Sequence, residues 1–220
     1  DCGHAVRPQH NIPVLGWLLL RGRCADCDTR ISARYPLVEA GTAVLFVAVT
    51  AKFGLSWELP AYLYLAAIAV ALAAIDLDTM RLPNKIVLPS YVVALVLFAP
   101  AVLDQRSWTA ATRGLIAAVV LYAFYLFLAV LPRGMGFGDV KLAGLLGLYL
   151  GWLGWSSVLV GAFAGFLLGG LVGAVLMATH RAKRATRIPF GPYMLAGAFL
   201  AVFAAAPIAD WYSSLLLPTT

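Results

Sequence analysis

The feature that most constrains the fold of this chain is an uncharged run of 38 residues, 142–179. A helix rises 1.5 Å per residue, so about 20 apolar residues cross a bilayer and this run is too long for one crossing. The residues GWLGWSS near its middle are typical of a turn. The run therefore predicts a hairpin of two membrane-spanning helices.

The rest of the chain is also strongly apolar. Of its 220 residues, 62% are hydrophobic and 12% are charged, with a mean hydropathy of +0.89. This composition excludes an ordinary soluble globular domain, and the alternation of a β-barrel is absent from the sequence. We therefore expect an all-α, polytopic membrane helix bundle of about seven spans, at residues 37–51, 59–75, 86–103, 114–132, 142–153, 156–178 and 190–209.

The basic residues predict an orientation for these spans. The net charge of +6 would suit nucleic acid, but the basic residues lie in short loops between apolar runs, where the positive-inside rule accounts for them. We therefore expect membrane lipid, and no nucleic acid, as a partner. Counted by alternate loops, thirteen of the 16 Lys and Arg residues fall on the side of the N-terminal segment. This bias predicts that the N-terminal segment faces the cytoplasm and the C-terminus faces away.

Two loops on the predicted cytoplasmic side carry acidic residues at the ends of spans. Asp76 and Asp78 follow a span in IDLDTMRLPNK, and Asp139 precedes a span in RGMGFGDVK. Each of these acids can be interpreted as an ordinary loop charge at the level of the lipid headgroups. It can also be interpreted as a functional group, because an acid at the edge of the hydrocarbon costs free energy and such residues usually mark a functional path. The three glycines before Asp139 favour the second, since they let other chains approach closely. Two neighbouring carboxyl groups that share a proton can activate water, as in aspartic proteases.

At these residues the sequence resembles the type IV prepilin peptidase family, which consists of polytopic GxGD-type aspartic proteases. The resemblance implies a catalytic pair at Asp76 and Asp139, with Asp78 as an accessory acid and as the alternative member from the first motif. It covers nearly the whole chain, through five blocks in the family's order and spacing: NIPVLGWLLLRGRCADC, ISARYPLVE, IDLDTMRLPN, GMGFGDVKLAGLLGLYLGW and IPFGPY.

The cysteines suggest a metal site in the N-terminal segment. Cys24 and Cys27 form a CxxC pair, and Cys2 lies upstream. On the reducing side of the membrane these thiols favour structural zinc over a disulfide, and the alternative is three thiols without metal. A closed zinc site needs four ligands, for which His4 is a further candidate. Because the family often has two CxxC pairs, we expect the chain to begin inside this motif, with the family's first span missing.

The resemblance also implies an activity. We expect an enzyme of the bacterial inner membrane that removes the leader peptide from type IV prepilins or pseudopilins at the cytoplasmic face, without a metal in the proteolytic step. Many family members also methylate the new N-terminus with S-adenosylmethionine, and this cofactor is expected from the resemblance alone. We expect residues 1–36 to form a partial, cytoplasmic zinc-knuckle-like segment and residues 37–220 to form the membrane-embedded peptidase domain.

Two other classes of protein are alternatives. The first is a transporter or channel that uses the membrane-edge acids, and the second is a catalytically silent scaffold for pilus assembly. A transporter more often shows acids at mid-span or paired repeats with broken helices, whereas these acids lie at span ends on one side. The sequence indicates no oligomeric state.

Two further patterns are interpreted as structural. The segment IPFGPYM at residues 188–194 suits the kinked start of the last span because it contains two prolines and a glycine. Small residues in the long uncharged run are expected to let helices pack closely, at glycines 161, 165, 169, 170 and 173.

Overall fold

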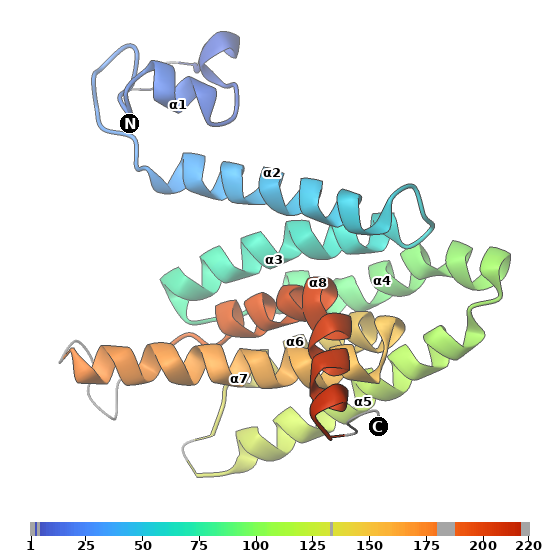
Figure 1. Ribbon diagram of the computed structural model, residues 1–220. Coiled ribbons are helices and arrows are strands. Elements are labelled where there is room, and N and C mark those ends of the chain that lie inside the picture. Colours follow the sequence, from blue (N-terminus) through green and yellow to red (C-terminus); the bar gives the residue numbers. More distant parts are fainter. Residues whose placement is uncertain (1–2, 4, 133, 180–187, 217–220) are drawn as a thin grey trace. The chain divides into compact units, whose positions relative to one another are not determined.

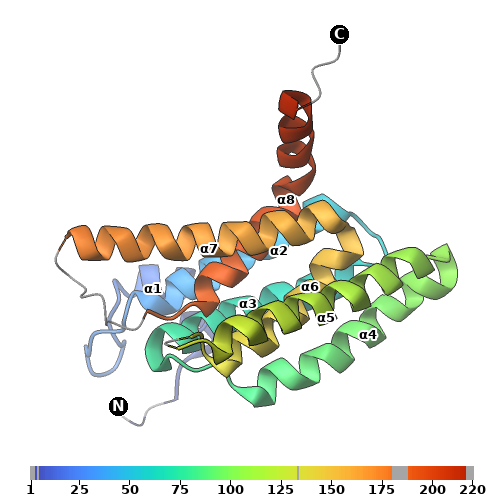
Figure 2. The same cartoon turned by 90° about the horizontal axis from the view of Figure 1, so that it is seen from below.

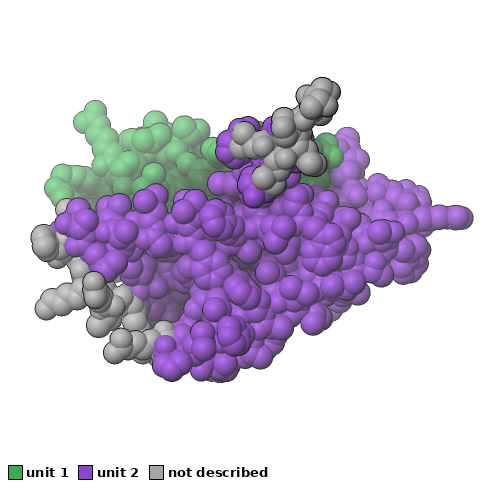
Figure 3. Space-filling view, turned by 60° about the horizontal axis from the view of Figure 1, so that its bottom comes forward, with its two compact units in different colours: residues 1–54 green, residues 55–220 purple. Residues whose placement is uncertain are grey.

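The computed structural model describes residues 3, 5–132, 134–179 and 188–216, and these residues form helices joined by turns and loops (Figure 1). The chain divides into two compact units, residues 1–54 and 55–220 (Figure 3). The boundary predicted near residue 36 separates the cysteine-containing segment from the first apolar span, and that division stays a prediction.

The first unit joins the cysteine-containing segment to one long helix. It contains the 3₁₀ turn η1 (Pro8–His10), the short helix α1 (Leu15–Leu19) and the helix α2 (Arg34–Phe53). The backbone N–H of Val14 donates a hydrogen bond of 2.7 Å to the carboxylate of Glu39. This bond gives the acid near the start of α2 a polar partner.

In its described residues, the second unit is a bundle of the six helices α3–α8. The seven predicted spans correspond to these helices and to α2 of the first unit. Among the described residues, six helices are long and apolar enough to cross a membrane, namely α2–α5, α7 and α8. The remaining one, α6, has 17 residues. The prediction of an all-α polytopic bundle is thus confirmed. The helices of this unit are α3 (Leu59–Thr79), α4 (Asn84–Gln105), α5 (Trp108–Val130), α6 (Phe137–Leu153), α7 (Trp155–Ala178) and α8 (Gly191–Leu216).

Helix α6 is the core of this bundle. Twelve of its 17 residues are buried, and it packs on α4, α5, α7 and α8 (Figure 2). An uncharged helix that is covered on all sides needs no polar face. The sequence from Leu142 to Leu153 has none, so its apolar character reflects burial within protein.

Glycines allow the closest helix contacts. A methyl group on Gly147 of α6 would lie 2.5 Å from the carbonyl oxygen of Ala117 in α5. One on Gly165 of α7 would lie 3.3 Å from the Cα atom of Met194 in α8. No atom of the described residues lies within 4 Å of the corresponding position at Gly170, so the predicted packing role is wrong for that glycine. The other contacts fit the use of small residues between membrane helices.

Three segments meet at one end of the second unit: the turn from α3 to α4, the loop from α5 to α6, and the first turn of α8 (Figures 1 and 2). Helix α3 ends at Thr79, and its C-cap residue Met80 has left-handed backbone angles of φ 50° and ψ 38°. Pro83 follows in an extended conformation as the N-cap of α4. These residues reverse the chain within a few positions, which keeps the ends of α3 and α4 together.

Candidate active site

Asp76 lies in the last turn of α3, with its side chain turned into the bundle. The residue is 4% exposed, and its Oδ2 atom accepts a hydrogen bond of 3.0 Å from the backbone N–H of Gly191. Gly191 is the first residue of α8. The contact joins residues 115 positions apart and gives a buried carboxyl group a donor, which a buried charge requires.

Asp139 is the third residue of α6 and lies ahead of its apolar part. Its Oδ2 atom accepts a hydrogen bond of 3.2 Å from the N–H of Gly136, the N-cap residue. Burial raises the pKa of Asp139 to about 6, the negative charge of Asp76 raises it further in the same direction, and the bond from Gly136 opposes both. The two carboxyl groups are therefore close enough to influence each other's ionisation.

Leu82 joins the segments that carry the two acids. Its side chain lies so close to Gly138 that a methyl group on Gly138 would be 3.0 Å from the Cβ atom of Leu82. A methyl group on Gly191 would lie 3.2 Å from its Cδ2 atom. Leu82 is therefore packed between the first turn of α6, which carries Asp139, and the start of α8, which contacts Asp76. This packing fixes the relative positions of the elements that hold the acids.

A second set of polar contacts ties α4 to α6 next to Asp139. The ammonium group of Lys141 donates a hydrogen bond of 2.9 Å to Oδ1 of Asn84. The hydroxyl of Tyr91 donates one of 2.6 Å to the carbonyl oxygen of Lys141. Because both bonds link residues at least 50 positions apart, they hold the first turn of α6 against α4.

Asp78 differs from Asp76 in its surroundings. It is exposed, whereas Asp76 is buried, although the two residues belong to the same turn of α3. Residues two positions apart on a helix point about 200° apart around its axis. The helical conformation of this segment therefore turns Asp76, and not Asp78, toward α8.

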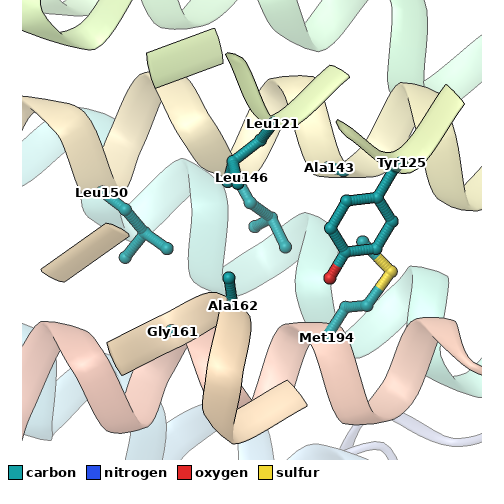
Figure 4. Close-up of a pocket in the computed structure, with 8 residues that line it drawn as sticks. All are labelled: Leu121, Tyr125, Ala143, Leu146, Leu150, Gly161, Ala162 and Met194. Carbon is teal, nitrogen blue, oxygen red and sulfur yellow. The ribbon is translucent and has the colours of Figure 1, made fainter. Parts of the chain in front are cut away.

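Figure 4 shows a small pocket in the seam between α5, α6, α7 and α8. It has about 220 Å³ of empty space, open solvent at its mouth included, and aliphatic side chains form most of its lining. The hydroxyl of Tyr125 and the thioether of Met194 are the exceptions among its lining residues. Such a lining provides no carboxyl group or metal ligand, so the pocket does not by itself supply the chemistry of a hydrolase.

The CxxC pair lies on a tight turn of the first unit. The N–H of Cys24 donates to the carbonyl oxygen of Thr29 at 2.9 Å, and the N–H of Asp28 donates to the carbonyl of Cys24 at 3.1 Å. Asp28, next to Cys27, has a φ of 57°. Within the described part of the chain no three metal-binding side chains cluster. The other predicted ligands, Cys2 and His4, lie outside the described residues.

Sequence reasoning missed two residues that the structure brings to this site. Gly191 was interpreted only as part of a kinked helix start, and Asn84 was assigned no role. A main-chain N–H leaves no mark on the sequence. The available signal was that IPFGPYM begins a span on the same side of the bundle as both aspartate loops.

The fold and the two acids define a class of protein. This is a multi-pass membrane protein in which two carboxyl groups from distant parts of the chain lie at one end of a helix bundle, near enough for the charge of one to raise the pKa of the other. An aspartic protease requires such a pair.

Comparison with known proteins identifies the family. The model of the type IV leader peptidase family matches residues 63–177, which include Asp76 and Asp139, and that of the bacterial peptidase A24 N-terminal domain matches residues 1–53. The chain belongs to the type IV leader peptidase family. No solved structure matches it.

Several relatives carry the name prepilin leader peptidase/N-methyltransferase. The one from Pseudomonas putida is 39% identical over 208 residues, which are 92% of this chain and 69% of the relative. That from Aeromonas hydrophila is 40% identical over 226 residues, 96% of this chain and 72% of the relative. The Pseudomonas aeruginosa protein is 36% identical over 206 residues, 91% of this chain and 69% of the relative.

Proposed function

We propose that this protein is a membrane aspartic endopeptidase that removes the leader peptide from type IV prepilins or pseudopilins, with Asp76 and Asp139 as its catalytic pair. Membership of the leader peptidase family supports the reaction class. The observation that carries the assignment is the buried carboxyl group of Asp76, which is bonded to Gly191 and lies at the same end of the bundle as Asp139. Burial and the charge of Asp76 together raise the pKa of Asp139 to about 6. One carboxyl group can then keep a proton while its neighbour is ionised.

The reaction needs these two groups and one water molecule. The ionised carboxylate takes a proton from water as the water oxygen adds to the carbonyl carbon of the scissile peptide. The protonated carboxyl group gives its proton to the carbonyl oxygen, and a tetrahedral diol forms. When the C–N bond breaks, the first acid protonates the leaving amine and the second takes a proton back from a diol hydroxyl. The products are a carboxylic acid and an amine, and both acids return to their starting states.

Burial supports Asp76 as the first member of the pair and Asp78 as an accessory acid. A catalytic carboxyl group must share a low-dielectric environment with its partner for their ionisations to be coupled strongly. Asp76 is buried, while Asp78 is exposed. We therefore propose that Asp78 has only a minor, accessory role at the exposed edge of the site.

We propose that the end of the bundle that carries the acids faces the cytoplasm. Within the second unit, Arg81, Lys85 and Lys141 flank this end, whereas Arg106 and Arg113 flank the other. The excess of basic residues is expected on the cytoplasmic side. The terminal position of the acids also favours a peptidase over a transporter, whose charged groups more often lie at mid-span.

The names of the relatives add a second proposed activity. They are called N-methyltransferases as well as peptidases, and we propose that this chain methylates the new N-terminal amine with S-adenosylmethionine. The methyl group would pass from the sulfonium to the amine nitrogen, and the amine would lose a proton. No residue is assigned to this reaction.

One experiment tests both activities. The purified protein is incubated with a prepilin, with and without S-adenosylmethionine, and the masses of the products are measured by mass spectrometry. We expect loss of the leader in both samples and one added methyl group only with the cofactor. Intact prepilin in both samples would contradict the proposed peptidase, and cleavage without methylation would contradict only the second activity.

The CxxC turn leads to a prediction about metal content. We propose that Cys24, Cys27 and Cys2 hold a structural zinc ion, since thiolates at this spacing are common zinc ligands. Purified protein should contain about one zinc per chain, and Cys24→Ser or Cys27→Ser should lose most of it and lower the melting temperature. Elemental analysis measures this, with Ser32→Ala as the control. Zinc-free wild-type protein of full stability would contradict the proposal.

A further inference from the structure

We infer that the backbone N–H of Gly191 positions Asp76 as the ionised base of the pair and leaves Asp139 to carry the shared proton. This inference rests on the proposed function and assigns the roles that the proposed reaction leaves open. It makes Gly191 a positioning residue, because it would act on substrate only through Asp76.

The contact between Gly191 and Asp76 favours the ionised carboxylate. The N–H donates to Oδ2 at 3.0 Å in a buried environment. A main-chain N–H can only donate, and a donor binds a carboxylate more strongly than a neutral carboxyl group. Gly191 also begins a helix of 26 residues, and the N-terminus of a helix favours a neighbouring negative charge. With Oδ2 held in this way, Oδ1 is the oxygen available to a water molecule.

Glycine is required at this position because of the carboxylate. A methyl group on Gly191 would lie 2.8 Å from Oδ2 of Asp76, closer than real side-chain carbons approach. The backbone of Gly191 does not have the positive φ that excludes other residues. Alanine therefore fits the helix start itself, and its main effect should be to displace the carboxylate of Asp76.

Asp139 is the better holder of the proton. Like Asp76, it lies beside a helix N-terminus, that of α6, but its donor, the N–H of Gly136, is at a longer distance of 3.2 Å. Burial and the charge of Asp76 raise its pKa to about 6 in spite of that bond. The groups described around Asp76 are the N–H of Gly191 from α8, the charge of Asp139 from α6 and the apolar side chain of Leu82. Only the first of these favours ionisation of Asp76.

Gly191→Ala tests this inference through the kinetics of prepilin cleavage. We expect kcat to fall by about 10- to 100-fold, the effect of losing one hydrogen bond to a charged group, while KM stays unchanged. Gly170→Ala makes the same chemical change where nothing lies within 4 Å, and it should keep wild-type kcat. Wild-type kcat in Gly191→Ala would overturn the inference.

A double variant separates the two contacts of the added methyl group. In Gly191→Ala combined with Leu82→Ala, the crowding against Leu82 is gone and the crowding against Asp76 remains. We expect the double variant to stay as slow as Gly191→Ala or slower. Rescue of kcat would show that packing against Leu82 caused the loss, and it would overturn the role of Gly191.

Infrared spectroscopy tests the proton assignment without any change at Gly191. At about pH 5, below the pKa of Asp139, the wild-type protein should show the band of a protonated carboxyl group, and Asp139→Asn should lose it. In Asp76→Asn the band should remain but titrate at a lower pH, because the charge of Asp76 no longer raises the pKa of Asp139. The reverse pattern would overturn the inference. The proposed function fails separately, if Asp76→Asn still cleaves prepilin. If Asp76→Asn is inactive and Gly191→Ala keeps the wild-type kcat, only the present inference is contradicted and the proposed function stands.

Discussion

Asp76→Asn and Asp139→Asn should each reduce prepilin cleavage by about 100- to 10,000-fold, because general acid–base catalysis contributes that factor and neither amide can exchange the required proton. The two acids act on one reaction, so the double variant should be no slower than the slower single variant. Product mass and initial rates measure this. Normal cleavage by Asp139→Asn would contradict the assignment.

Asp78→Asn is the matched control for these variants. It removes a carboxyl group from the same turn of α3, but from an exposed position. We expect its cleavage rate to stay within a few-fold of wild type, since it leaves Asp76 and Asp139 unchanged. If Asp78→Asn lost as much cleavage activity as Asp76→Asn, Asp78 would be a catalytic residue too and could be the first member of the pair.

The loss of activity in Asp139→Asn should not come from unfolding. The pKa of Asp139 is raised from 3.8 to about 6, so ionisation of this side chain opposes folding and wild-type stability decreases as the pH rises through about 6. Asparagine does not ionise. The variant should therefore melt at the same temperature as wild type or higher at pH 7, and this advantage should disappear below about pH 4. Melting curves in detergent test this.

Gly147→Leu should have the largest effect on the fold itself. The Cβ atom would lie 2.5 Å from the carbonyl oxygen of Ala117, and 2.8 Å from the Cα atom of Ala118, so backbone atoms of α5 would have to move. Overpacking typically costs 1–3 kcal/mol, and we expect about 3 kcal/mol here because main chain cannot rotate away. Asp139 is on the same helix, so activity should be lost with the fold.

Gly170→Leu is the control for Gly147→Leu. It adds the same side chain to a membrane helix where nothing lies within 4 Å of the new Cβ atom. This variant should keep the wild-type yield of folded protein, melting temperature and cleavage rate. Wild-type stability of Gly147→Leu, like that expected of the control, would show that α5 and α6 do not approach as closely as Gly147 indicates.

The sequence was sufficient to place the helices. Each predicted span falls on one of α2–α8, because long apolar runs broken by charged or turn residues leave few choices in a membrane protein. The sequence could not show that α6 is the core of the bundle, since lipid and protein interiors are equally apolar. For the same reason the glycine pattern predicted contacts correctly at Gly165 and wrongly at Gly170.

The two acids were also predictable, whereas their surroundings were not. Asp76 and Asp139 stand out because charged residues are rare at the ends of apolar runs. Whether Asp76 or Asp78 faces the bundle depends on the helical phase of the last turn of α3, which the sequence does not fix. The contact from Gly191 involves only a backbone atom, so no side chain marks it.

The pH dependence of prepilin cleavage tests most directly whether Asp139 works as a protonated partner of Asp76. Burial and the charge of Asp76 raise the pKa of Asp139 to about 6, and the proposed reaction needs its protonated form. Activity should therefore decrease as the pH rises through about 6. We predict that kcat/KM measured from about pH 4 to pH 9 has an alkaline limb near that value. A constant kcat/KM from about pH 5 to pH 9 would contradict the shared proton.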